Sequence, residues 1–172
     1  MTRWVAFAIA VCAVAAGCDD NGTTSPSNQP AVFAAILRPA NEVPPIGNAE
    51  SGGNGAAQIT LQLTRSTAGA ITGATADFYF QVSGFPGNTT VVGAHIHPGA
   101  ASVNGPVMVN TGLTAGSPFI AVTGTGEFRA TGITVTPALA QSIVDNPAGF
   151  YFNIHSPINP GGFARGQLTR IQ

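Results

Sequence analysis

Several short segments of this chain alternate between apolar and polar side chains, one residue at a time. Residues 57–65 place Ile59, Leu61 and Leu63 on one side and glutamine or threonine on the other, and residues 74–82 repeat the pattern with aromatic side chains. Because successive side chains of a β-strand point to opposite faces, each segment is predicted to be a half-buried strand. This pattern favours β-sheets over helices as the main structure.

Turn-forming residues separate these segments, since the 172 residues include 22 glycines and 13 prolines. Short strands with turn signals between them are typical of an antiparallel sandwich or barrel. The expected fold class is therefore all-β, an antiparallel Greek-key-like β-sandwich or barrel. Further strands are expected at residues 32–37, 89–97, 106–110, 118–123 with an extension to 128, 150–155 and 163–171.

A single short helix is predicted near residues 137–145. Thr136 is a suitable N-cap residue, and Pro137 suits the first helical position. Leu139 and Ile143 are spaced four residues apart, as on one face of a helix, and a proline two residues beyond the segment ends it.

The amino terminus has the organisation of an export signal. Arg3 is followed by an apolar run over residues 4–16, which is too short to span a membrane comfortably. The run ends in Ala-Ala-Gly-Cys, which resembles a bacterial lipobox, so residues 1–17 are predicted to be a lipoprotein-type signal peptide. The resemblance implies lipidation of Cys18 and attachment to the membrane through that lipid. The alternative is an ordinary signal peptide with an incidental cysteine.

Residues 18–30 are predicted to be the lipidated cysteine and a flexible tether, because residues 19–30 carry almost no apolar side chains. The folded domain is expected at 31–172. It contains no cysteine, so it has no disulfide. The predicted location is the bacterial cell envelope, on the periplasmic side or the cell surface.

The charge of the chain argues against nucleic-acid binding. Only 8% of the residues are charged, the net charge is −1, and the six basic residues are scattered arginines. Binding to nucleic acid needs a basic patch, which is missing here. The sequence also has no nucleophile motif, phosphate loop or zinc-knuckle cysteines. The expectation leans against an enzyme.

The three histidines are the one group with a geometric argument for a site. His95 and His97 share one face of a predicted strand, and His155 ends another strand on which Tyr151 and Asn153 face the same way. All of these side chains are expected to point away from the core. Three imidazoles can bind copper or zinc. The alternative is that the histidines hydrogen-bond to Asn153 or to the turn at residues 104–105 and stabilise the fold.

Arg165 is expected on the same side as His155. It could hold an anion or carboxylate ligand through a bidentate contact. The favoured alternative is an internal ion pair with Glu42 or with Asp77, because the chain has so few charges.

The chain from residue 32 to 171 resembles the CHRD domain, a family first described in the developmental protein chordin and found in many bacterial exported proteins. That resemblance implies an extracytoplasmic β domain without an established catalytic activity. It rests on residues 41–45 (NEVPP), 94–101 (AHIHPGAA), 104–107 (NGPV), 151–155 (YFNIH) and 160–168 (PGGFARGQL).

Residues 93–97 are also similar, more distantly, to the strand of Cu/Zn superoxide dismutase that supplies two copper ligands. His155 and Arg165 follow in the order that this enzyme family uses. However, the chain has no histidine between His97 and His155 and lacks the structural disulfide, so dismutation is not expected.

These observations lead to two hypotheses. The first is an exported, lipid-anchored envelope protein with a single CHRD domain, a non-catalytic binding or structural module for an extracytoplasmic protein or polysaccharide. The alternative is a copper- or zinc-binding protein that uses His95, His97 and His155.

Overall fold

The structure is a computed structural model, and it describes residues 28–172. The predicted signal peptide at 1–17 and the lipidation site at Cys18 lie outside the described residues, as does most of the tether. Among the described residues, no helix has the length and apolar character needed to cross a membrane.

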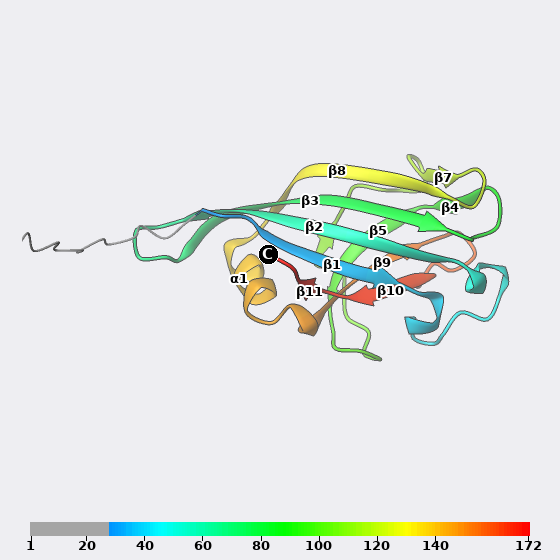
Figure 1. The fold of residues 1–172 in the computed structure, drawn as a ribbon, viewed down its shortest axis with the longest axis horizontal. Coiled ribbons are helices and arrows are strands. Elements are labelled where there is room, and N and C mark those ends of the chain that lie inside the picture. The colour runs from blue at the N-terminus through cyan, green and yellow to red at the C-terminus, as the bar shows by residue number, and fades with distance from the viewer. Residues whose placement is uncertain (1–27) are drawn as a thin grey trace, which may run out of the picture.

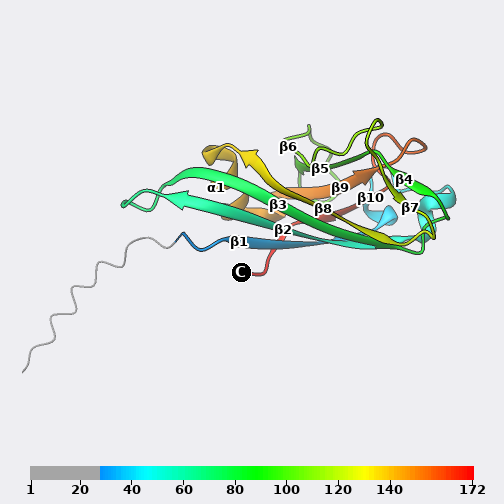
Figure 2. The same ribbon diagram turned by 90° about the horizontal axis from the view of Figure 1, so that it is seen from above.

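Two antiparallel sheets pack face to face, as Figure 2 shows from above. The first sheet has the strand order β11-β1-β2-β3-β8 and the second has the order β10-β9-β5-β6. The fold is thus a sandwich and not a closed barrel, and the expected all-β class is confirmed. The strands of the first sheet are β1 (Ala31–Leu37), β2 (Asn54–Arg65), β3 (Ile71–Ser83), β8 (Gly126–Val135) and β11 (Thr169–Arg170).

The strands of the second sheet are β5 (Gly93–Pro98), β6 (Val109–Asn110), β9 (Phe150–His155) and β10 (Ala164–Gln167). A separate pair, β4 (Thr89–Val91) and β7 (Phe119–Ala121), lies at one end of the sandwich (Figure 1).

The predicted helix is confirmed as α1 (Pro137–Asp145), the one α-helix of the described chain, and the side chain of Thr136 accepts a hydrogen bond from the backbone N–H of Leu139. Three short 3₁₀ turns complete the described chain: η1 (Pro39–Asn41), η2 (Ala49–Gly52) and η3 (Pro147–Gly149).

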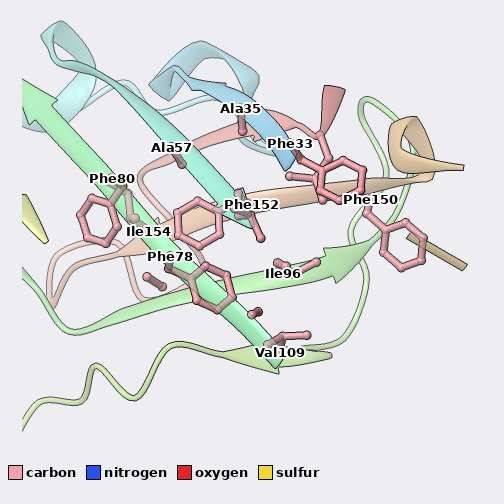
Figure 3. Packing of buried hydrophobic residues seen from close by; sticks show 14 of the residues in the cluster. Phe33, Ala35, Ala57, Phe78, Phe80, Ile96, Val109, Phe150, Phe152 and Ile154 are labelled. Carbon is pink, nitrogen blue, oxygen red and sulfur yellow. The ribbon is translucent and has the colours of Figure 1, made fainter. Parts of the chain in front are cut away.

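The core lies between the two sheets and is rich in aromatic rings. Phe152 of β9 lies 5.8 Å from Phe78 and 5.9 Å from Phe80 of β3, measured between ring centroids, and Figure 3 shows these rings meeting between the strands. The alternation that predicted β2 and β3 is therefore the pattern that builds the inner face of the first sheet.

Two predicted strands are each divided between different sheets. The segment at 89–97 breaks at Val92, so that β4 pairs with β7 while β5 pairs with β9 and β6. The segment at 163–171 breaks at Leu168 into β10 and β11, which belong to opposite sheets. Alternation shows that a segment is extended but does not show which strand it pairs with, so these breaks were not predicted.

The strands predicted at 32–37 and 150–155 are confirmed as β1 and β9, whereas two further strand predictions are corrected. The segment at 106–110 is shorter than expected, since β6 spans only two residues, and β7 and β8 are separate strands. Most of β8 was not predicted, because its period-2 pattern is interrupted. A register shift opposite Asp77 leaves Gly132 at φ +71°, with its N–H donating to the Asp77 carboxylate at 2.9 Å.

A matched pair of isoleucine substitutions tests this core. Ile96 of β5 is 0% exposed, whereas Ile120 of β7 is 48% exposed. We expect Ile96→Ala to lower the free energy of unfolding by about 2–5 kcal/mol, because it leaves a cavity between the sheets. Ile120→Ala should change it by less than about 0.5–1 kcal/mol. Urea denaturation measures both values, and equal effects would contradict the sandwich core.

Candidate metal site

The pairing of β5 with β9 brings the three histidines together. The register sets Gly93 opposite His155, His95 opposite Asn153 and His97 opposite Tyr151. All of these positions share one face of the sheet, because they alternate with the core residues on both strands. The two predicted histidine-bearing segments are therefore neighbours in space, although 57 residues lie between His97 and His155 in the sequence.

The three imidazoles converge on one point. One ring nitrogen from each of His95, His97 and His155 lies within 4.8 Å of the others. The ring centroids are 4.7 Å apart for His95 and His155, 5.6 Å for His95 and His97, and 6.0 Å for His97 and His155. Among the described residues, this is the one cluster of three or more such side chains with the spacing to hold a metal ion.

The histidine face is covered rather than open, which corrects the expectation of a polar outer face. His97 is 5% exposed and His155 is 9% exposed, and Tyr151 and Asn153 are also buried. The segments that follow the two histidine-bearing strands supply hydrogen-bond partners from outside the sheet. His95 remains partly exposed, so the cluster has one side open to solvent.

Hydrogen bonds fix the proton positions on two of the rings. Nδ1 of His97 lies 2.9 Å from the carbonyl oxygen of Gly105, and Nδ1 of His155 lies 3.0 Å from that of Pro160. A carbonyl oxygen can only accept, so Nδ1 is the donor in both rings. In the neutral imidazole, Nε2 then carries a free lone pair, which is the form that binds a metal.

Two other ring nitrogens of the cluster have no hydrogen-bond partner. Nε2 of His97 and Nδ1 of His95 are buried and have no hydrogen-bond partner. Burial also lowers the pKa of all three imidazoles, and that of His95 falls to about 4. The proximity of His155 and His97 lowers the pKa of His95 further. Burial thus favours the neutral form of all three rings, and Nε2 of His97 keeps a lone pair that no hydrogen bond uses.

Arg165 is 1% exposed and secures the loop that follows β5. Its guanidinium donates to the side chain of Asn104 at 2.9 Å and to the carbonyl oxygens of Val103 and Ala100 at 3.1 and 3.3 Å. This is the loop whose Gly105 carbonyl orients His97.

Tyr151 links Arg165 to the histidine cluster. The Arg165 guanidinium lies 3.7 Å from the centroid of the Tyr151 ring, and His97 stacks on Tyr151 with the ring centroids 4.9 Å apart and the planes 4° apart. The Tyr151 hydroxyl accepts a hydrogen bond from the backbone N–H of Gly105 at 3.2 Å. Sequence reasoning missed this stack, because nothing in the alternation shows that the outer face of β9 is covered.

Comparison with protein-family descriptions gives a match to the CHRD domain over residues 33–168. The chain belongs to the CHRD domain family. No curated protein and no solved structure matches it. The histidine cluster and the buried arginine lie within the CHRD domain, and the motifs that suggested the family at residues 94–101, 151–155 and 160–168 surround the cluster.

Glu42 is also buried and is close enough to Arg165 for the two charges to interact. Burial raises the pKa of Glu42 to about 7, although the Arg165 charge and the Asn153 amide both act to lower it. The predicted ion pair is not formed: among the described residues no salt bridge within 4.0 Å joins the two side chains, the hydrogen bonds of Arg165 go to the loop, and its charge acts on Glu42 from a greater distance. Asp77, the other proposed partner, lies on β3 and accepts from Gln62 and Gly132.

A second buried carboxylate, Glu50, supports the loop after β9. It accepts hydrogen bonds from the hydroxyl of Ser156 at 2.7 Å and from the side-chain amide of Asn159. These contacts hold the loop whose Pro160 carbonyl orients His155. No sequence signal pointed to Glu50, which lies in a glycine-rich segment more than 100 residues away.

Two arginines that stack on tyrosine rings provide a matched test of whether Arg165 holds the loop after β5 in place. Arg129 stacks on Tyr79 at 4.0 Å as Arg165 stacks on Tyr151, but the Arg129 side chain is exposed. We expect Arg165→Met to lower the free energy of unfolding by about 3 kcal/mol or more, because it removes three hydrogen bonds of a buried guanidinium and the opposite charge nearest to the buried Glu42. Arg129→Met should cost about 1 kcal/mol or less. Amide hydrogen exchange in residues 99–106 should accelerate only in the Arg165 variant. Unchanged exchange rates in that variant would contradict the role of Arg165 in holding the loop.

Glu42 should make the stability of the metal-free protein depend on pH. A carboxyl whose pKa is raised from 4.5 to about 7 on folding stabilises the fold below pH 4.5, and this contribution is lost as the pH rises through 7. Relative to Glu42→Gln, the wild type should therefore lose about 3 kcal/mol between these limits. Urea denaturation of both proteins from pH 4.5 to about pH 8 measures the difference. A difference that does not vary with pH would exclude the raised pKa.

Proposed function

We propose that this protein is an exported, lipid-anchored envelope protein whose CHRD domain binds one copper or zinc ion through His95, His97 and His155. The observation that carries the proposal is the convergence of three imidazole nitrogens within 4.8 Å, with Nδ1 of two rings already donating to backbone carbonyls. Metal-ligating histidines typically use the second nitrogen in this way, which fixes the tautomer and the ring direction.

The chemistry of the cluster suits copper or zinc. Neutral imidazoles bind both metals, whereas calcium and magnesium prefer oxygen ligands. Three protein ligands leave a coordination position for water or another group, as in catalytic zinc sites. The partial exposure of His95 provides the side from which an ion could enter.

A second candidate function is a non-catalytic binding or structural module in which the histidines only stabilise the fold. The bonds of His97 and His155 to loop carbonyls and the stack on Tyr151 favour it. His95 separates the two candidates, because its Nδ1 is buried and makes no hydrogen bond in the metal-free protein. If the histidines only stabilise the fold, replacing His95 should change the protein little. A metal site, in contrast, requires His95 as a ligand.

The envelope location and the anchor rest on the sequence of the first 30 residues. The basic start, the apolar run and the Ala-Ala-Gly-Cys ending support export and lipidation at Cys18. The lipid would place the domain at a membrane surface, with an extracytoplasmic protein or polysaccharide as its partner.

Elemental analysis and metal titration test the proposed site. We expect the full chain, with Cys12 and Cys18 replaced by serine and without a histidine tag, to bind one Cu(II) or Zn(II) per molecule. His95→Gln, His97→Gln and His155→Gln should each weaken binding of the same metal by at least about tenfold, because each removes one ligand.

The stability of the metal-free variants provides the control. His95→Gln should unfold at nearly the same urea concentration as wild type, so its lost binding cannot be ascribed to misfolding. Binding that survives removal of all three histidines would exclude this site, and the absence of any bound metal would leave the structural module as the function.

A further inference from the structure

We infer that the side-chain carbonyl of Asn153 is a fourth ligand of the metal and that the Glu42 carboxylate holds it in the ligating orientation. The inference rests on the proposed metal site. It adds an oxygen to the three nitrogens and assigns a positioning role to a buried acid outside the cluster.

Asn153 occupies the centre of the covered face. It lies on β9 opposite His95 of β5 on one side and Arg165 of β10 on the other. The side chain is buried, and its Oδ1 lies 2.9 Å from Nε2 of His155. The amide is also close enough to His97 to influence the pKa of that ring. Asn153 is therefore beside all three histidines.

The contact between Asn153 and His155 lacks a proton when the ring is neutral. Nδ1 of His155 donates to the Pro160 carbonyl, so Nε2 has only a lone pair to offer. The amide oxygen of Asn153 is also an acceptor, and two lone pairs then face each other at 2.9 Å. A cation bound to both atoms would satisfy this arrangement, which no hydrogen bond between the neutral groups can do.

Glu42 explains why the amide oxygen faces the histidines. Nδ2 of Asn153 and Oε1 of Glu42 both lie beside Gly162, at 2.5 and 2.7 Å from the point that a Cβ atom on that glycine would occupy. Oε1 of Glu42 is buried without a hydrogen-bond partner, and the Asn153 amide is close enough to lower the pKa of this carboxyl. A carboxylate next to the amide attracts its N–H₂ end and turns the oxygen toward the metal.

Gly162 is part of this arrangement, because a side chain there would enter the space between the amide and the carboxylate. Its φ of +122° is also one that favours glycine. Gly162, which appears in the sequence only as part of a turn signal, thus allows Glu42 to approach Asn153.

Cu(II) binding to the full chain, with the same cysteine replacements, tests the inference through affinity and the electron paramagnetic resonance spectrum. We expect Asn153→Leu to weaken Cu(II) binding by at least about tenfold and to alter the spectrum, because an oxygen ligand is lost. Asn153→Asp retains an oxygen and should retain binding, with a spectrum shifted by the charged ligand. Asn54→Leu, an exposed asparagine on β2, is the matched control and should leave both unchanged.

Two variants of Glu42 test the positioning role. Glu42→Leu removes the polar group beside the Asn153 amide, so it should weaken Cu(II) binding and broaden the spectrum. Glu42→Gln keeps an oxygen there and should retain the wild-type affinity and spectrum. Equal binding by Glu42→Leu and wild type would overturn this role.

The outcomes separate this inference from the proposed function. If the wild type binds Cu(II) through the histidines but Asn153→Leu binds as tightly with the same spectrum, Asn153 is not a ligand and the three-histidine site stands. If Asn153→Leu does not fold, Asn153→Asp decides, because an unchanged spectrum excludes ligation at this position. If the wild type binds no metal, the proposed function itself fails.

Discussion

The pairing of β5 with β9 is the interaction on which both the core and the site depend. It joins strands that are distant in sequence, and it uses both faces of the resulting ribbon. One face places Ile96 and Phe152 against the aromatic side chains of β3, while the other gathers His95, His97 and His155. Since a shift of one residue would exchange these faces, the burial of the aromatic core also fixes the positions of the histidines.

The charged residues of the domain are few, and several of them are buried around the histidine cluster. Arg165 and Glu50 each secure one of the two loops whose carbonyl oxygens orient an imidazole. Burying such charges is costly and does not by itself favour stability. Their common effect here is geometric, because each holds a loop that would otherwise be free to move away from the cluster.

The site combines rigid strands with covering loops. The histidine side chains originate from paired strands, which limits their movement, and the loops determine the tautomers of His97 and His155 and cover these two rings. This arrangement is what a preorganised metal site requires: ligands on rigid elements, supported by further hydrogen bonds. It also explains why the histidine motif and the Pro-Gly-Gly-Phe-Ala-Arg-Gly segment occur together in this CHRD domain, since the second segment provides both the turn and the arginine.

The sequence by itself determined the β class, the helix at Pro137–Asp145, the inward residues of β2 and β3, the CHRD family and the three histidines as one candidate group. These features depend on local periodicity, capping and motifs, which the chain displays in order. The tertiary structure alone decided that the histidine face is covered, that Tyr151 connects Arg165 to His97, and that Asn153 lies near both Glu42 and His155. Those features depend on which distant segments pack together. Alternation along a strand gives two faces, but it cannot show what lies against the second one.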